Sequence, residues 1–468
     1  MASRTISPRI SPLPGLVILL GILGTAPGQA GHLISGPMLG YVEHREALIW
    51  LEVEDAETVS LACWPEERPD KKTLLEMPAP PPHPAGGSIL KFRPGLLEPG
   101  TTYRYTIAID GEDVTPAPGI LQFRTRTLWE WRTDAPDFSF LAGSCAYVNE
   151  PVYDRPGTPY GKGTGIFLHM AQTGADFMIW LGDNVYLREV DLSSESGIWY
   201  RYQHDRRIDD LQPLLRAMSH RAIWDDHDYG PDNSNRSYQH KATSRAVFDA
   251  YWGNPTAGQP GDPGIYHKFD YGDVGFILLD NRTHRDDSRL EQDLNPQKTQ
   301  YGAQQLDWLK QSLLQFQQSP QITFKIVATG NQFLETNSSG GESANEFRRE
   351  RREILDFIRD EKITGVLFLT GDIHTTILQK HLLPGLYPLY DLTTSPLTSG
   401  ISQTHLAHTV NDPNRVEGTV VPDQNFCRLD VSGPRDQRRL TIRCFDKTNL
   451  LRWTHTLTAT DLTFSANP

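Results

Sequence analysis

Short runs of uninterrupted apolar residues recur along the chain, and each is followed at once by polar residues. One such run spans residues 177–181 and precedes Asp183, and another spans residues 365–370 and precedes Asp372. A short run that is apolar at every position is typical of a strand buried on both faces. Because open α/β sheets bind ligands just beyond the carboxyl ends of their strands, the pattern predicts a site built from strand ends.

Further apolar runs end in the same manner, because a carboxylate or another side chain that can bind a metal ion follows directly after each. They are FSFLAGS before Cys145, RAIW before the cluster Asp225, Asp226, His227 and Asp228, VGFILL before Asp280, and FKIVATG before Asn331. Polar side chains also extend the first two strand ends, because Asn184 and Tyr186 follow Asp183, and His374 follows Asp372. These strand ends are the strongest signal in the sequence.

The remaining periodicity divides the chain into an all-β part and an α/β part. Residues 31–127 contain strand-like runs, at 47–53, 58–63 and 102–109. From residue 138 onward, strands alternate with amphipathic helices, expected at about 165–172, 304–315 and 347–359. After about residue 386 the pattern is β again. This order predicts a two-sheet α/β sandwich with helices outside, preceded by a small all-β sandwich.

Two of the four cysteines occupy positions that pair in the predicted strands. Strands at 426–431 and 440–445, joined by a turn over 432–437, place Cys427 directly opposite Cys444. This arrangement allows a disulfide in an oxidising compartment, and it equally allows two buried thiols on the core face. Both alternatives stay open.

The 468-residue chain has a formal net charge of −13 and a pI of about 5.6. A binder of nucleic acid or of an anionic membrane needs a basic face, so this balance argues against a nucleic-acid-binding patch. If the substrate is an anion, its attraction must come from local cations, because the global field opposes it.

Residues 1–30 have the pattern of a secretory signal. Arg4 and Arg9 precede an apolar core at residues 16–23, which is too short to span a bilayer, and small residues allow cleavage after Ala26 or Ala30. The alternative is a loosely packed N-terminal helix. The signal predicts an extracytoplasmic protein, periplasmic or secreted, with no transmembrane anchor once the signal is removed.

The side chains after the strand ends form two sets of metal ligands that share Asp183. A thiolate, a tyrosinate and a carboxylate suit a trivalent iron, whereas carboxylates with an amide oxygen suit calcium, magnesium or manganese. The first set is Cys145, Asp183, Tyr186 and His374, and the second is Asp183, Asp226, Asn331 and Asp372. Two ions bridged by a carboxylate hold a phosphoryl group and generate a hydroxide at neutral pH. Such ions also solve the charge problem, since they attract an anion.

The motifs GSC, GDNVY, WDDHDYGPDN, GNQ and GDIH, in that order, resemble the alkaline phosphatase D family of metallophosphatases. The pattern is similar to the wider calcineurin-like and purple acid phosphatases, and LLEPGTTYRY resembles the turn-then-tyrosine signature of fibronectin type III domains. The resemblance implies a four-layer αββα metallophosphatase sandwich with an N-terminal all-β, fibronectin type III-like domain. The expected segments are a signal peptide at 1–30, the fibronectin-like domain at 31–128 and the catalytic domain at 136–468.

The resemblance also implies an activity and cofactors. It implies a secreted phosphomonoesterase and phosphodiesterase that acts on small phosphoesters with Fe³⁺ and Ca²⁺, with Mg²⁺, Mn²⁺ or Zn²⁺ as alternatives to calcium. By analogy, Asp226 occupies the place of an amide ligand, His227 that of the catalytic histidine, and Asp372 with His374 that of two final histidines. A metal-bound hydroxide would attack phosphorus, and His227 would protonate the leaving oxygen.

Residues near these ligands suggest supporting roles. Asp225 or Asp228 is expected to orient His227. Arg282 lies just beyond Asp280, so it is a candidate to hold a phosphate bidentately, with Asn184 and His227 as further substrate contacts. A structural ion pair is the alternative for Arg282 or Arg285, with Asp280, Asp286 or Asp287 as the partner.

Two other functions compete with the hydrolase. One is a non-catalytic surface protein in which the fibronectin-like module adheres and the phosphatase fold has decayed, although the ligand set is complete. The other is a thiol hydrolase with Cys145 as the nucleophile, but FSFLAGSCAY contains no residue to pair with that thiol. Bound metal and release of p-nitrophenol from a phosphate ester would separate the metal-dependent hydrolase from these two.

Overall fold

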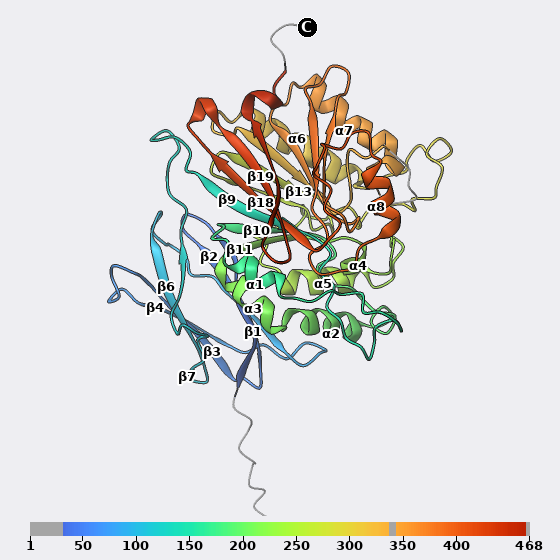
Figure 1. Ribbon diagram of the computed structural model, residues 1–468. Coiled ribbons are helices and arrows are strands. Elements are labelled where there is room, and N and C mark those ends of the chain that lie inside the picture. The colour runs from blue at the N-terminus through green and yellow to red at the C-terminus, as the bar shows by residue number, and fades with distance from the viewer. Residues whose placement is uncertain (1–30, 337–342, 465–468) are drawn as a thin grey trace, which may run out of the picture.

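The computed structural model describes residues 31–336 and 343–464. The predicted signal segment therefore lies outside the described residues. Within them, no helix is both long and apolar enough to cross a membrane. Two large sheets lie face to face in the body of the molecule, and helices cover their outer sides (Figure 1). The expected mixed α/β sandwich with helices outside is confirmed.

The large sheet has nine strands in the spatial order β20-β19-β18-β9-β10-β11-β1-β2-β5. Its central strands β9, β10 and β11 run parallel to one another. The bounds are β1 His32–Val42, β2 Ala47–Glu54, β5 Ser88–Phe92, β9 Phe138–Gly143, β10 Phe177–Leu181, β11 Ser219–Ile223, β18 Asn425–Ser432, β19 Arg439–Asp446 and β20 Leu451–Thr458.

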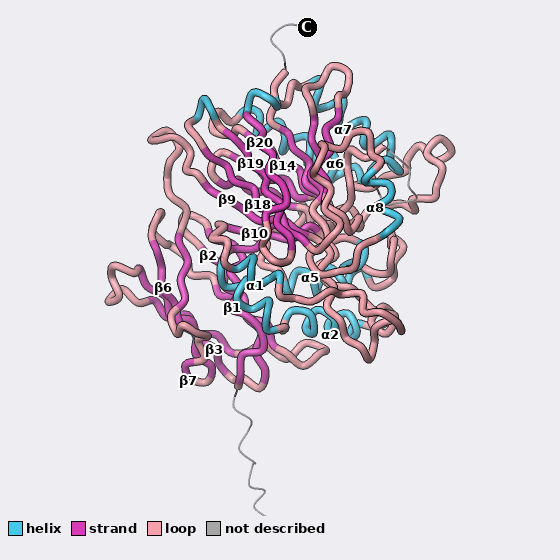
Figure 2. Tube along the Cα trace, in the orientation of Figure 1, coloured by secondary structure: helices cyan, strands magenta, loops and turns pink. Residues whose placement is uncertain are grey.

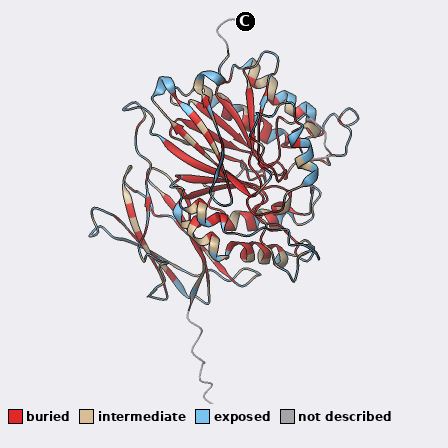
Figure 3. Cartoon of the chain, viewed as in Figure 1, coloured by how far each residue is buried: buried red, intermediate tan, exposed pale blue. Residues whose placement is uncertain are grey.

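The second sheet has six strands in the order β12-β13-β14-β15-β17-β16, of which β13, β14, β15 and β17 are parallel. Its bounds are β12 His267–Tyr271, β13 Val274–Leu278, β14 Phe324–Ala328, β15 Val366–Thr370, β16 Ile377–His381 and β17 Leu389–Thr393. The two sheets meet through aromatic rings. The ring centre of Phe276 on β13 lies 5.2 Å from that of Phe140 on β9 and 5.4 Å from that of Phe177 on β10. Their strands form the buried centre of the molecule (Figure 3).

Helices cover both outer faces of this pair of sheets. Helix α3 contacts β1, and α1, α2 and α5 lie on the same side, whereas α6 contacts β13 and α7 on the other side (Figure 1). Helices α1, α6 and α7 match the sequence predictions. The bounds are α1 Ile166–Ala171, α2 Glu195–Arg206, α3 Gln212–Ala217, α4 Asp226–Tyr229, α5 Lys241–Tyr251, α6 Gly302–Gln318, α7 Arg348–Asp360 and α8 Gln403–Val410, with 3-10 turns at Asp209–Leu211, Ala344–Phe347, Arg435–Gln437 and Ala459–Leu462.

Helix α2 is absent from the sequence predictions because its buried face is polar. Arg201 is fully buried in this helix, where it pairs with Asp191 and Glu150. A helix that buries paired charges instead of apolar side chains has little hydrophobic periodicity, so the 3.6-residue pattern does not reveal it.

The N-terminal strands divide between two sheets. Strands β4 Thr73–Pro78, β3 Thr58–Pro65, β6 Thr102–Ile109 and β7 Glu112–Asp113 form a third sheet, and β8 Leu121–Arg124 pairs with β6. In contrast, β1 pairs in parallel with β11 through Leu39 and Ser219, so β1, β2 and β5 extend the large sheet. The all-β character of this part is confirmed. The fibronectin-like identity and the three segment boundaries stay predictions.

Strand β2 explains why the two parts share a sheet. Its residues are buried on both faces: Leu48 and Trp50 belong to the main core, whereas Ile49 and Leu51 belong to a second core under the third sheet. A strand that is apolar on both faces must be covered on both, and the body formed by the two large sheets provides one of the two covers.

The register predicted for the cysteine hairpin is confirmed, because Cys427 pairs with Cys444 across β18 and β19. Both cysteines are buried free thiols in this structure. Of the two alternatives, the structure contains the pair of core thiols.

A glycine contact at the junction of the two parts gives a stability test. A methyl group on Gly253, just after α5, would clash with the Cα of Gly40 on β1. We expect Gly253→Ala to lower the free energy of unfolding by about 1–3 kcal/mol, because neither backbone segment can yield without moving β1. Calorimetry measures the melting temperature, and Gly95→Ala is the matched control because open space surrounds Gly95. Equal melting temperatures for the two variants would show that the junction accommodates the methyl group and would contradict a tight contact there.

Candidate metal centre

The predicted site residues lie at the carboxyl ends of parallel strands from both sheets. Cys145 follows β9, Asp183 follows β10 and the 225–228 cluster follows β11, whereas Asn331 follows β14 and Asp372 follows β15. Loops gather in this region, between α5 and α8 (Figure 2). Because parallel strands end at the same edge, two facing sheets bring these loops together.

The first four predicted ligands converge on one point. Tyr186 Oη donates a hydrogen bond of 3.0 Å to Asp183 Oδ2 and lies 3.0 Å from His374 Nε2. The thiol of Cys145 lies 3.7 Å from the same Asp183 oxygen. Ligand atoms of Cys145, Asp183 and His374 all lie within 4.8 Å of one another. We call Cys145, Asp183, Tyr186 and His374 the first donor cluster.

A second donor cluster shares Asp183 with the first. It consists of Asp183, Asp226 and His227, whose ligand atoms also lie within 4.8 Å of one another. The two oxygens of Asp183 face different neighbours, because Oδ2 accepts from Tyr186, whereas Oδ1 accepts a 3.3 Å bond from the backbone N–H of His227. A carboxylate in this position is placed to bridge two ions.

Four of these residues hold an unusual backbone conformation. Cys145, Asp183, Asp372 and His374 have φ values of 63°, 52°, 76° and 54°. Residues other than glycine seldom adopt this left-handed region, and each instance costs about 1–3 kcal/mol. Such residues gather at functional sites, because the surrounding structure there holds the strain in place.

The clusters contain more buried acid than nearby cations can neutralise. Burial raises the pKa of Asp183 well above its usual range, and the carboxylates of Asp226 and Asp225 raise it further. Burial, followed by the charge of Asp183, also raises the pKa of the Tyr186 phenol and of the Cys145 thiol. A bound cation reverses this balance and deprotonates such ligands. The donor set therefore fits metal ions.

Two side chains already have the protonation state that a metal ligand needs. Burial lowers the pKa of His374 to about 3, so its imidazole is neutral. Burial raises the pKa of Asp226, but the charges of His227 and Arg282 outweigh it and lower the pKa to about 2. Asp226 is therefore ionised.

The remaining predicted ligands lie close to the clusters. The carbonyl oxygen of Asp372 lies 3.5 Å from the Cys145 thiol, and its carboxylate contributes to the raised pKa of Asp183. Asn331 Oδ1 accepts hydrogen bonds from Gln300 Nε2 at 2.7 Å and from Asn281 Nδ2 at 3.0 Å. Ligation by Asp372 and Asn331 stays a prediction.

The substrate role of Arg282 stays a prediction, and the structure shows which groups hold this side chain. This side chain is fully buried, with 0% exposed, and its guanidinium pairs with Asp225. It also lies 3.8 Å from Asp226. Arg282 therefore neutralises and positions the acidic loop. Asp280 lies beside this arrangement, because Oδ1 of Asp280 accepts a 2.9 Å bond from the Arg282 backbone N–H.

The substrate role of Asn184 also stays a prediction. Its side chain is buried and Nδ2 donates a 2.8 Å hydrogen bond to the Ile223 carbonyl at the end of β11. Its backbone N–H donates to Asp228 Oδ1 at 2.9 Å. Asn184 thus ties the loop after β10 to the loop after β11.

The predicted role of Asp225 or Asp228 in orienting His227 stays a prediction. The two carboxylates cap α4, where Asp228 accepts the backbone N–H of Asp225 at 3.0 Å. The His227 ring lies 4.3 Å from the Tyr186 ring, and its Nε2 lies 3.6 Å from Asp232 Oδ1.

The residues that hold His374 and Cys145 were not predicted from the sequence. Tyr160 Oη lies 2.7 Å from His374 Nδ1, and Ser395 Oγ both donates to Cys145 Sγ at 3.1 Å and accepts the His374 backbone N–H at 3.0 Å. Ser395 belongs to the hydroxyl-rich stretch TTSPLTSG, which directly follows the buried strand β17. That stretch has the same pattern as the other strand ends, so it could have indicated that Ser395 lies at the site. Tyr160 lies in a long loop, where no pattern in the sequence indicates such a role.

Comparison with known proteins places the chain among phosphatases. The profile of a family described as PhoD-like phosphatase matches residues 144–437, and that of a domain of unknown function (DUF7800) matches residues 30–127. The alkaline phosphatase D of Bacillus subtilis (strain 168) is 24% identical over 324 residues, which cover 60% of this chain and 52% of that protein. The chain thus spans about half the length of this curated relative.

Two solved structures have a similar fold. A structure of PhoD matches with a TM-score of 0.71 and 16% identity, covering 94% of this chain and 95% of the other. A purple acid phosphatase from yellow lupin seeds matches with a TM-score of 0.64 and 11% identity, covering 90% of this chain and 74% of the other. At these identities the likeness concerns the fold.

The contact between Tyr160 and His374 gives a test of metal binding. When His374 Nε2 faces the first donor cluster, Nδ1 carries the proton and donates to Tyr160 Oη, which fixes the ring. We expect Tyr160→Phe to weaken metal retention about 10- to 100-fold, measured as metal content after dialysis against graded chelator. Tyr153→Phe is the matched control, because both tyrosines are 40% exposed and lie in the loop after β9. Identical retention in both variants would remove Tyr160 from the site.

Proposed function

We propose a function from one premise: the chain belongs to the PhoD-like phosphatase family. The proposal is that it is a metal-dependent phosphoester hydrolase with two ions that share Asp183. The observation that carries it is the arrangement of the two Asp183 oxygens, one toward Tyr186 and the Cys145 thiol and one toward His227. The two oxygens of Asp183 therefore face different groups of side chains, which is the geometry expected of a carboxylate that bridges two ions.

The donor types suggest which ions would bind. The first donor cluster combines a thiol, a phenol, an imidazole and a carboxylate, which suits Fe³⁺. Oxygen donors of Asp183, Asp226, Asn331 and Asp372 suit Ca²⁺, with Mg²⁺, Mn²⁺ or Zn²⁺ as alternatives. When bound, two such ions supply an activated water and neutralise the charge of a phosphoryl group.

The chain's own residues would complete the reaction. His227 is partly exposed, with 24% of its side chain accessible, and packs on Tyr186 at the edge of both clusters. It is therefore placed to donate a proton to the leaving oxygen or to hold a phosphoryl oxygen. Arg282 would act indirectly, because it holds Asp225 in place and balances the charge of Asp226.

The substrate and location are also proposed. Small phosphomonoesters and phosphodiesters fit a centre that recognises the phosphoryl group itself, and the signal-like residues 1–30 support an extracytoplasmic enzyme. The relative's printed name, alkaline phosphatase D, agrees with this substrate class. A thiol hydrolase is disfavoured because Cys145 is fully buried and its thiol pKa is raised.

Colour tests the identity of the first ion. Protein expressed with iron and calcium is expected to absorb visible light through charge transfer from the Tyr186 phenolate, and Tyr186→Phe is expected to abolish that band. Cys145→Ser should weaken iron binding while the fold, measured by circular dichroism, persists. A visible band that survives in Tyr186→Phe would contradict ligation by this phenol, and unaltered metal content and rate in Cys145→Ser would remove that thiol from the ligand set.

The rate tests the role of His227. We expect His227→Asn to lower kcat for p-nitrophenyl phosphate and its diester about 10²- to 10⁴-fold, because the general acid is lost. Metal content is measured in the same samples, so that loss of the acid is separated from loss of a ligand. His169→Asn on α1 is the control for removing a partly buried histidine. If His227→Asn has the wild-type kcat with both substrates, His227 is not the general acid.

A further inference from the structure

The loop after helix α4 places an exposed carboxylate at the edge of the candidate metal centre. Nε2 of His227 lies 3.6 Å from Asp232 Oδ1 and 4.0 Å from Asp226 Oδ2. The side chain of Asp226 is 5% exposed, whereas that of Asp232 is 71% exposed. His227 therefore lies between a buried acid on the side of the donor clusters and an exposed acid on the side of the solvent.

The same loop is bonded to the second donor cluster, which gives Asp232 a defined position. The Asn233 backbone N–H donates a 2.7 Å hydrogen bond to Asp226 Oδ2, and the Gly230 backbone N–H donates to the Asp226 carbonyl at 2.7 Å. Asn233 has a φ of 59°, and its Nδ2 donates to Asp232 Oδ2 at 3.0 Å. Because these bonds already order the loop, a ligand that meets Asp232 does not have to order it on binding.

The basic side chains beside this loop have acidic partners of their own. Arg236 pairs with Asp286 at 2.6 Å, and Arg155 pairs with Glu189 at 2.8 Å. The hydrogen bond to Glu189 raises the pKa of Arg155, and the charge of Asp232 adds to this effect, so the second pair lies near Asp232. Within the described residues, Asp232 itself forms no ion pair with an arginine or a lysine. The edge of the metal centre therefore keeps the negative charge of Asp232.

His227 connects this charge with the leaving group of a substrate. Under the proposed function, His227 protonates or holds the leaving oxygen of a phosphoester whose phosphoryl group lies at the two donor clusters. The rest of the leaving group then extends past His227 toward the solvent, on the side of Asp232. A fixed charge at this range attracts an opposite charge and repels a like one, even where water reaches both.

We propose that Asp232 selects substrates by the charge of their leaving group. The preferred substrates are phosphoesters of amino alcohols, whose ammonium group would lie against Asp232, and phosphoesters of hydroxy acids are disfavoured. The selection rests on the proposed function, because it takes the phosphoryl group to lie at the two donor clusters. It adds a substrate class to that function, because a centre that recognises the phosphoryl group itself does not distinguish one leaving group from another.

Binding of three phosphonates of similar size tests this selection. They are 2-aminoethylphosphonate, n-propylphosphonate and phosphonoacetate, whose organic groups are cationic, neutral and anionic, and none contains an ester bond to hydrolyse. Calorimetry measures Kd for each with the metal-loaded full-length protein. We expect Asp232→Asn to weaken binding of the first about two- to fivefold, to leave the second unchanged and to tighten the third about two- to fivefold. Sodium chloride at about 1 M should remove most of these differences, because it shortens the screening length to about 3 Å.

A second substitution separates the charge of Asp232 from a structural role. Because its side chain is 71% exposed, we expect both Asp232→Asn and Asp232→Lys to keep the fold, which circular dichroism checks. Asp232→Lys should shift the Kd of the cationic and the anionic phosphonate in the same directions as Asp232→Asn and further. If Asp232 only held His227 in place, each substitution would change all three Kd values by the same factor, and that result would overturn the proposal.

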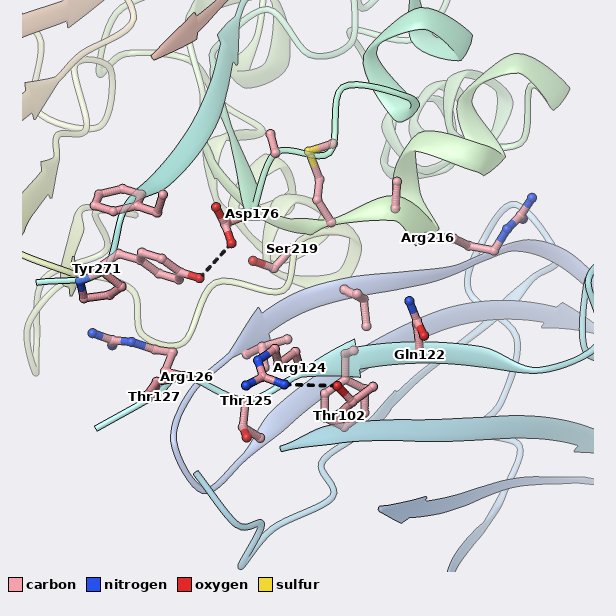
Figure 4. A pocket seen from close by; sticks show the side chains of 18 of the residues that line it. Thr102, Gln122, Arg124, Thr125, Arg126, Thr127, Asp176, Arg216, Ser219 and Tyr271 are labelled. Atoms are coloured by element: carbon pink, nitrogen blue, oxygen red, sulfur yellow. Dashed lines mark hydrogen bonds between the residues drawn. The ribbon is translucent and has the colours of Figure 1, made fainter. Parts of the chain in front are cut away.

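A matched control lies at the opposite end of the central strands. A cleft of about 710 Å³ there separates β8 from the loops that precede β9, β10 and β11, and its floor and opposite wall each contain hydrogen bonds of their own, between Arg124 and Thr102 and between Tyr271 and Asp176 (Figure 4). The turn between β18 and β19 lies at the same end, and Asp436 is exposed in it. Asp436→Asn removes an exposed carboxylate at this end, so its three Kd values are expected to equal those of the wild type.

Phosphate release distinguishes this selection from the proposed function. O-phosphoethanolamine, n-propyl phosphate and 2-phosphoglycolate are esters whose leaving groups carry the same three charges. Charge-dependent binding of the phosphonates without phosphate release from the esters supports selection by Asp232 and contradicts the hydrolase. Phosphate release with equal shifts of all three Kd values in Asp232→Asn supports the hydrolase and overturns the selection. Failure of all three phosphonates to bind would overturn both.

Discussion

The structure depends on one buried carboxylate, Asp183, whose two oxygens lie between two groups of polar side chains. Burying this acid beside Asp226, Asp225 and Asp228 is unfavourable without cations, as the raised pKa of Asp183 indicates. Arg282 pairs with Asp225 and lies 3.8 Å from Asp226, so it offsets part of this negative charge. Stability of this region and affinity for metal ions are therefore linked.

The scaffold brings the loops of both sheets into backbone contact around that carboxylate. A methyl group on Gly182 would lie 2.7 Å from the Asp225 side chain, and one on Gly330 would lie 2.7 Å from the same carboxyl. Glycine is required where two loops approach so closely, which explains why the motifs read Gly-Asp and Gly-Asn. The left-handed backbones of Cys145 and His374 then aim their side chains at the common centre.

Three of the N-terminal strands, β1, β2 and β5, form part of the large sheet. Because β1 continues the large sheet beside β11, the N-terminal strands belong to the same sheet as the strands that carry the predicted metal ligands. Hydrogen bonds between neighbouring strands join the N-terminal strands to the rest of the large sheet, so the two parts form one rigid unit.

The sequence by itself determined the buried strands, the polar side chains that follow them and their order, because burial and strand ends leave local marks in runs of apolar residues. It also determined the register of Cys427 and Cys444, since a hairpin is a local structure. Only the tertiary structure decided that Arg282 pairs with Asp225, that Tyr160 reaches His374 across 214 positions, and that β1 completes the large sheet. These contacts join segments far apart in the chain. No local periodicity records them, because they arise when two facing sheets bring their loops together.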